Sequence, residues 1–155
     1  MVIVTYCAYC KAKEEYKKHV EEVKVHTLSK YNEGYSTDKN IKKVLDYITH
    51  DSNVKLSLQQ PTTNEKEMFL RFFEELEIMM HKELLNENEV YILFAYYAIE
   101  ISRGGKYNKS FDYKDIEDKS EWAYFRDFVK RMKDYSKKNN LWKNYFYLLH
   151  AVCFR

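Results

Sequence analysis

Glycine and proline are almost absent from this chain, and their scarcity limits its fold more than any other feature. Three glycines and one proline occur in 155 residues. Sandwiches and barrels of many short strands need turn residues roughly every 8–12 positions, so the composition disfavours them. Helices lose stability wherever glycine or proline interrupts them, and this chain has few such interruptions. The sequence therefore predicts an all-α fold.

The same scarcity excludes several enzyme classes. The glycines are Gly34, Gly104 and Gly105. Neither GxGxxG nor GxxxxGK[ST] can be written with them, so the two common phosphate-binding loops are absent. The GxSxG nucleophile elbow is absent for the same reason. We expect no cofactor and infer no small-molecule substrate.

The rest of the composition describes an ordinary globular domain. Hydrophobic residues make up 45% of the chain and charged residues 32%, and this length corresponds to one domain. A net charge of +2 neither requires nor excludes nucleic acid. The abundant lysine, asparagine, tyrosine and phenylalanine are read from A/T-rich codons, which indicates a low-GC bacterium or its phage. Three cysteines imply no disulfide framework, and we expect a reduced, cytoplasmic protein without a cleavable signal peptide.

Helical periodicity predicts a single bundle of five to six helices over residues 1–155. The first 32 residues form one long helix, which Asn32–Tyr35 with Gly34 should end. Ser36 or Thr37 should cap the next helix, whose apolar stripe is Ile41, Val44, Leu45 and Ile48. Residues 64–103 form a central helical hairpin and residues 120–154 a C-terminal one.

The central hairpin carries the strongest pattern. Residues repeat at a spacing of 3–4 on one face, with glutamates opposite: Met68, Phe69, Phe72, Phe73, Leu76, Met79 and Met80 against Glu74, Glu75 and Glu77. Capping boxes are expected at Thr62 with Glu65, where Asn64 is the alternative cap, and at Asn86 with Glu89. The second helix of the hairpin should bury Leu93, Phe94, Tyr97 and Ile101, and Gly104–Gly105 should end it.

The C-terminal hairpin should begin with Ser120 or Asp118 as a cap. Its first helix has a core face of Trp122, Phe125, Phe128, Val129, Met132 and Tyr135. After a turn at Lys137–Asn140, residues 141–154 form a final, very apolar helix. That helix and the apolar residues 2–9 either pack on each other or leave an exposed patch for a partner.

Part of the chain resembles an uncharacterised family of small helical bacterial and phage proteins. The resemblance covers roughly residues 27–136 and lies in FFEEL at residues 72–76, LLNENEVY at 84–91, Phe94, and Trp122 with Phe125. Glu83 stands where relatives usually have glycine. Relatives often carry an N-terminal membrane anchor, which implies a place at the inner face of the membrane if an anchor has been lost; residues 1–12 are too short to span one. The resemblance implies no catalytic residues.

The cysteines and histidines do not have the spacing of a metal site. Cys7 and Cys10 share a helix face, but His19 and His26 lie too far along the same helix to complete a zinc tetrahedron, so two small buried hydrophobic side chains are the better interpretation. Four histidines follow an acid by four residues, among them His81 after Glu77, which is typical of solvated ion pairs. No Glu-x-x-His pair suits a di-iron bundle. We expect no bound metal.

Two surfaces remain as functional candidates. The predicted helix after residue 120 carries a basic stripe that could follow a nucleic-acid backbone, formed by Arg126, Lys130, Lys133 and Lys137. A mixed stripe of Asp127, Arg131, Asp134 and Lys138 beside it is typical of a solvated face. An aromatic cluster in the final helix could bind a partner, namely Trp142, Tyr145, Phe146 and Tyr147.

The function expected from the sequence is a non-enzymatic module that binds a protein partner or a second copy of itself. Its expected surfaces are the acidic middle of the chain, residues 61–105 with four basic and nine acidic side chains, and the apolar final helix. The alternatives are a nucleic-acid-associated protein that uses the basic stripe, or the soluble part of a membrane-anchored protein.

Overall fold

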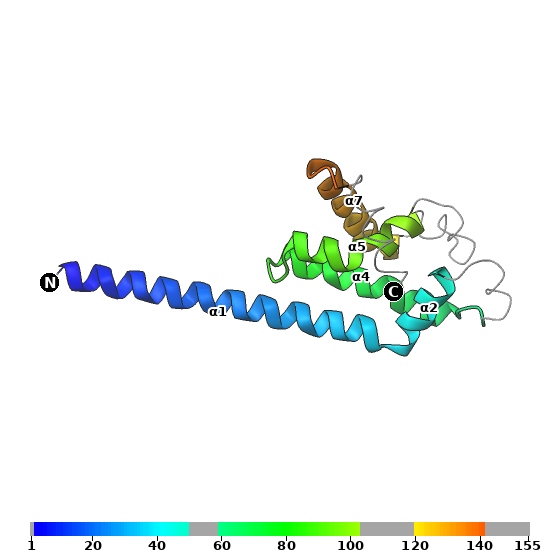
Figure 1. The fold of residues 1–155 in the computed structure, drawn as a ribbon, viewed down its shortest axis with the longest axis horizontal. Helices are drawn as coiled ribbons and strands as arrows, with labels where there is room; N and C mark the ends of the chain where they lie inside the picture. Colours follow the sequence, from blue (N-terminus) through cyan, green and yellow to red (C-terminus); the bar gives the residue numbers. More distant parts are fainter. Residues whose placement is uncertain (1, 50–58, 103–119, 142–155) are drawn as a thin grey trace.

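A computed structural model describes residues 2–49, 59–102 and 120–141, with side chains described from Tyr9 onward. These residues form α1 (Val2–Thr37), α2 (Lys39–Thr49), α4 (Thr63–His81), α5 (Glu87–Ser102), the 3-10 turn η2 (Ser120–Trp122) and α7 (Ala123–Lys138). Within these three segments there is no strand, so the predicted all-α bundle is confirmed (Figure 1).

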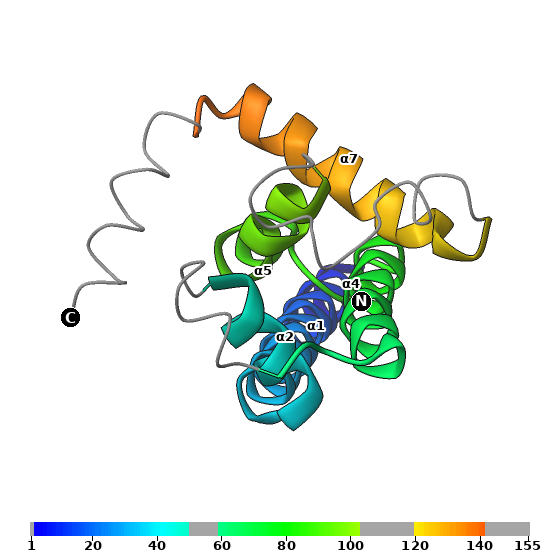
Figure 2. The same ribbon diagram turned by 90° about the vertical axis from the view of Figure 1, so that its right-hand side faces the viewer.

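Helix α4 is the centre of the bundle, as its apolar repeat predicts. It packs mainly against α7 on one side and α2 on the other, while α5 packs mainly against α7 (Figure 2). The backbones of the two helices of the predicted central hairpin approach each other at few points, although a short turn joins the helices, and large side chains such as Phe72 and Phe94 fill the space between them. Their shared neighbour α7 holds them together, since it lies against both.

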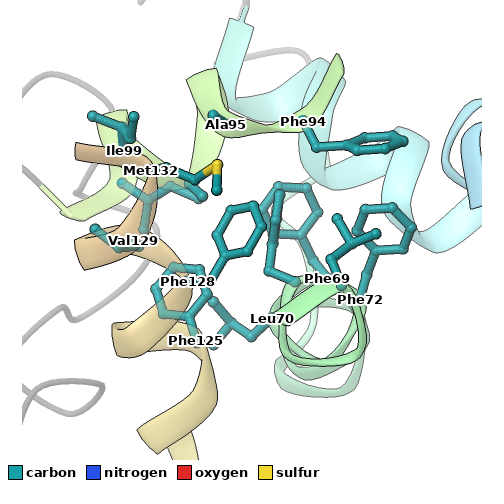
Figure 3. Packing of buried hydrophobic residues seen from close by; sticks show 14 of the residues in the cluster. Phe69, Leu70, Phe72, Phe94, Ala95, Ile99, Phe125, Phe128, Val129 and Met132 are labelled. Atoms are coloured by element: carbon teal, nitrogen blue, oxygen red, sulfur yellow. The ribbon is translucent and has the colours of Figure 1, made fainter. Parts of the chain in front are cut away.

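An aromatic core fills the space between α4, α5 and α7 (Figure 3). Phe73 is fully buried, with its ring centroid 5.3 Å from that of Phe128 and 5.9 Å from that of Phe125. The rings of Phe72 and Phe94 meet edge to face at 5.4 Å. Each such ring contributes about 1.5–3 kcal/mol through burial, so this cluster is the main source of stability.

The prediction that Leu93 lies in the core is wrong. Leu93 is 42% exposed, whereas Phe94 and Ile101 are buried and Tyr97 is half-buried. The buried face of α5 is set by Val90, Phe94 and Ala98, one helical turn apart, and Leu93 lies off that face.

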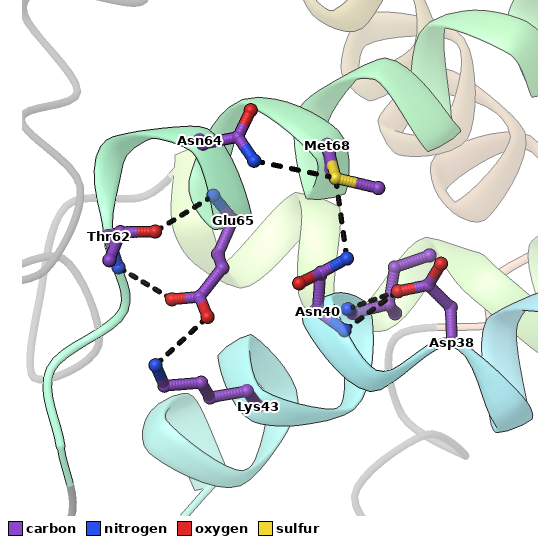
Figure 4. Close-up of polar contacts among 8 residues, drawn as sticks. Asp38, Asn40, Lys43, Thr62, Asn64, Glu65 and Met68 are labelled. Carbon is purple, nitrogen blue, oxygen red and sulfur yellow. Dashed lines mark hydrogen bonds and ion pairs between the residues drawn. The ribbon is translucent and has the colours of Figure 1, made fainter.

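The start of α4 is tied to α2 through polar contacts (Figure 4). Thr62 is the N-cap, and the predicted capping box is present: the Thr62 hydroxyl accepts from the Glu65 amide, while the Glu65 carboxylate accepts from the Thr62 amide. The same carboxylate accepts a hydrogen bond from Lys43 of α2 at 2.9 Å. Since Thr62 fills the cap position, the alternative cap Asn64 lies inside the helix.

The predicted end of the first helix is wrong, because α1 continues through Gly34 to Thr37. The Asp38 amide donates to the Gly34 carbonyl at 2.9 Å, which is a helical hydrogen bond. Tyr31 and Tyr35, on either side of the glycine, pack against Phe72 of α4 with ring centroids at 6.0 and 4.9 Å. This packing outweighs the low helix propensity of one glycine.

The predicted caps of α2 and the Ser120 cap of the last described helix are also wrong. Asp38 caps α2, since its carboxylate accepts from the amides of Asn40 and Ile41. Ser36 and Thr37 instead donate their hydroxyl hydrogens to a carbonyl within α1. Helix α7 follows η2 with Trp122 at its N-cap and no side-chain cap, because Ser120 belongs to the 3-10 turn.

Asn86 caps α5, since its side-chain oxygen accepts from the Asn88 amide at 2.9 Å, but Glu89 does not bond back to Asn86, so the capping box predicted there is not formed. The core face predicted for α7 is confirmed for Trp122, Phe125, Phe128, Val129 and Met132, and Tyr135 is half-buried. The alternative cap Asp118, the glycines at 104 and 105, and the final helix beyond Leu141 lie outside the described residues.

Candidate functional site

The N-terminal part of α1 extends as an arm beyond the other helices (Figure 1). Every residue from Lys11 to His19 is exposed. Contact with the core begins only at Leu28 and Tyr31, which pack against its edge, and at the buried Tyr35. We call residues Tyr9–Thr27 the arm.

Large apolar side chains lie exposed along one face of the arm. Tyr9 is 63% exposed, Tyr16 69% and Val23 39%, and Val20 between them is half-buried. Tyr9, Tyr16 and Val23 are seven residues apart, which places them on the same side of a helix. We call these three residues the seam, together with the neighbouring row at the same spacing of seven, namely Lys13, Val20 and Thr27.

The seam belongs to a seven-residue repeat that the sequence analysis missed. Residues 13–19 read KEEYKKH and residues 20–26 read VEEVKVH, so two glutamates, a seam residue, a lysine and a histidine recur at the same places. Such a repeat is typical of a helix that packs along another helix. A comparison of the arm with itself at a spacing of seven would have found it.

The seam leads into an open groove between α1 and α4. The groove has a volume of about 710 Å³. Its apolar lining includes Val23, Tyr31, Ile41, Met68, Phe72, Met79 and Leu84, and its polar lining includes His26, Lys30, Asp38, Arg71 and Glu75. An apolar floor with charged residues of both signs beside it suits an amphipathic helix.

A polar contact marks one wall of this groove. The Tyr31 hydroxyl donates to the Glu75 carboxylate at 3.4 Å. Partial burial raises the pKa of Tyr31, and the nearby Glu75 charge raises it further. The hydroxyl is therefore held in its neutral, hydrogen-bonding form.

Glu77 lies in the core rather than on the solvated face expected for it, so that prediction is wrong. It is 1% exposed and accepts two-pronged hydrogen bonds from Arg131 of α7, with N–O distances of 2.8–3.1 Å. His81 is exposed, and its Nε2 atom lies 3.4 Å from the Glu77 carboxylate. The hydrogen bonds with Glu77 raise the pKa of Arg131, which stays charged. Arg131 thus neutralises the buried Glu77 carboxylate, and this ion pair ties α4 to α7.

The basic stripe lies along one side of α7, as predicted. Lys130 and Lys137 are exposed, and Arg126 and Lys133 are half-buried. Lys137 lies 3.9 Å from Asp134. The neighbouring mixed stripe is only partly solvated, because Arg131 is bound to Glu77.

The other candidate residues lie mostly outside the part of the chain that the structure describes. The predicted partner cluster at residues 142–147 and the side chain of Cys7 lie outside the described residues, and Cys10 is a half-buried free thiol. Across the described segments, no three histidine, cysteine or acidic side chains could hold a metal ion together. The described helices also include none that is long and apolar enough to cross a membrane.

Comparison with known proteins found no matching protein family, curated protein or solved structure. The resemblance noted over residues 27–136 therefore stays a prediction, and the surfaces of the molecule carry the functional argument.

Proposed function

We propose that this protein is a non-enzymatic interaction module that binds an amphipathic helix of a protein partner along the seam and in the groove. The observation that carries the proposal is the row of large apolar side chains that runs from Tyr9 along the arm to the groove, with Lys13 as its one charged interruption. A cytoplasmic setting in a low-GC bacterium or its phage agrees with the composition.

The cost of leaving the seam in water supports this proposal. Burial of apolar surface stabilises a complex by about 25 cal/mol per Å². The two seam tyrosines expose a large area that a partner would bury. Tyrosine is enriched where interfaces hold most of their binding energy. Packing against a partner would also stabilise an arm that otherwise depends on its own backbone hydrogen bonds.

Nucleic-acid binding through α7 has weaker support. Asp134 lies 3.9 Å from Lys137, and Asp127 follows Arg126 directly in the sequence, so acids occur along the length of the basic stripe. Arg131 is already bound to Glu77. Phosphate contacts would compete with these pairs, whereas a helix partner on the seam displaces only water.

Site-specific photo-crosslinking in the cells that produce the protein tests the proposal. A photoreactive phenylalanine analogue replaces Tyr16 on the seam or, as a matched control, Lys18, an exposed residue on the opposite side of the arm. We expect a covalent protein adduct from position 16 and little from position 18. Equal yields from both positions, or no adduct from position 16, would overturn the proposal. Mass spectrometry of the adduct identifies the partner as another protein or a second copy.

A further inference from the structure

The seam has the spacing needed to pair with itself. In heptad terms Tyr9, Tyr16 and Val23 take position d, and Lys13, Val20 and Thr27 take position a. We infer that the occupant of the seam is the arm of a second copy of this chain, lying antiparallel. This inference rests on the proposed function and names its partner.

One antiparallel register matches every layer of the seam. It places Tyr9 against Thr27 of the second copy, Tyr16 against Val20, and Lys13 against Val23. Each d residue then meets an a residue, and each tyrosine meets a smaller side chain, so the layers can interdigitate. A parallel pair would instead stack each tyrosine on its own copy.

Lys13 favours the antiparallel direction. In a parallel pair it would face Lys13 of the second copy inside the seam, where two like charges repel each other. In the antiparallel pair its aliphatic stem lies along Val23 and its ammonium group reaches water. The one charged seam position therefore opposes the parallel arrangement.

The charges of two arms also permit close approach. Residues 9–27 contain five lysines and four glutamates, so each arm is nearly neutral. Lys17 and Lys24 lie on one edge of the seam, where they would meet the same edge of the second copy. Glu21 lies between them and pairs with Lys24 at 3.6 Å, which reduces the repulsion along that edge.

The groove continues the same interface. Helix α1 begins at Val2, seven residues before Tyr9, and Gly34 lies seven residues after Thr27. In the matched register the first two turns of one helix, about 10 Å long, lie over residues 28–34 of the other copy. Gly34 lines the groove, and a Cβ atom added there would meet nothing within 4 Å, so a neighbouring helix has room to approach.

The available surface suits a stable dimer. A specific interface buries roughly 1,600 Å² in total. Four tyrosines from two copies, each with on the order of 150 Å², supply more than a third of that area. The remaining seam residues and both grooves add to it.

Disulfide trapping tests the partner and its direction together. Cys7, Cys10 and Cys153 are first replaced by serine, and single cysteines are then placed by Tyr9→Cys and Thr27→Cys. We expect a covalent dimer under mild oxidation only when the two variants are mixed. Dimers from each variant alone would mean a parallel pair and would overturn the inference. Lys18→Cys, outside the seam, is the control and should give none with either variant.

Replacing Tyr9 removes part of the interface and lowers the affinity of the dimer, so two further measurements keep both tyrosines. Lys13→Cys mixed with Val23→Cys should trap the same dimer with both tyrosines kept, and the unmodified protein should sediment as a dimer. A monomer at all concentrations, with no trapped dimer from either mixture, would overturn the inference. The proposed function has its own test. If position 16 crosslinks to a different protein, the proposed function holds even though the inferred dimer does not.

Discussion

The carboxylate of Glu77 and the guanidinium of Arg131 form a two-pronged ion pair between α4 and α7, with N–O distances of 2.8–3.1 Å. Glu77 is 1% exposed, so its charge depends on the guanidinium of Arg131. The pair fixes α7 against the central helix of the bundle.

Replacing Arg131 with methionine should destabilise the protein strongly. The buried Glu77 carboxylate would lose its main partner, and such a loss costs about 3 kcal/mol in the free energy of unfolding. Urea denaturation followed by circular dichroism measures the change. Lys130→Met, at the exposed neighbouring position, is the matched control and should change stability by less than about 0.5 kcal/mol. Equal losses in the two variants would contradict the structural role of the pair.

Removing the cap of α4 should have a smaller effect. Thr62→Ala deletes the hydroxyl that accepts from the Glu65 amide, which costs about 1 kcal/mol. Thermal unfolding compares this variant with Thr63→Ala, an exposed position one residue further along. If both variants unfold at the same temperature as the wild type, the capping box contributes nothing to stability.

Because of Glu65, the free energy of unfolding should decrease as the pH becomes acidic. The hydrogen bond from Lys43, followed by that from the Thr62 amide, lowers the pKa of Glu65 in the folded protein. A lowered pKa means that the stabilisation is complete above the ordinary carboxyl range and is lost as pH falls through the folded value. Urea denaturation from neutral to acid pH should show a shallower loss in Glu65→Gln than in the wild type. Parallel profiles would contradict this assignment.

Gly34→Ala tests the continuity of α1. Gly34 lies within the helix and a Cβ atom there meets no neighbour, so alanine should raise the free energy of unfolding by up to about 1 kcal/mol. Circular dichroism and thermal unfolding measure the effect. A destabilised variant would mean that the glycine is needed for a bend.

The sequence predicts those parts of the fold that depend on local pattern. The apolar repeat from Met68 to Met80 and the Thr62 capping box predict α4 correctly, because both signals lie within one helix. Gly34 gives a false end for α1, since tyrosines on either side of it pack on α4 and keep the helix intact. Tertiary packing thus overrides local propensity there.

The polar core and the candidate site are harder to predict. Glu77 resembles its solvated neighbours in sequence, and its partner Arg131 lies 54 residues away, so no local pattern connects them. An apolar stripe indicates which face of a helix packs, but not whether the neighbour belongs to the same molecule. The exposure of Tyr9 and Tyr16 became evident only from the position of the arm outside the bundle.

Sedimentation equilibrium of two matched variants tests most directly whether the seam is the binding surface. Tyr16→Lys changes the seam, while Val25→Lys changes a residue of similar exposure, 63%, on another face of the arm. Two buried tyrosines are lost per dimer, so Tyr16→Lys should raise the dissociation constant roughly 100-fold or more and Val25→Lys should leave it nearly unchanged. Equal weakening by both variants would contradict the seam as the binding surface, and a wild-type protein that stays monomeric would contradict the pairing of two arms.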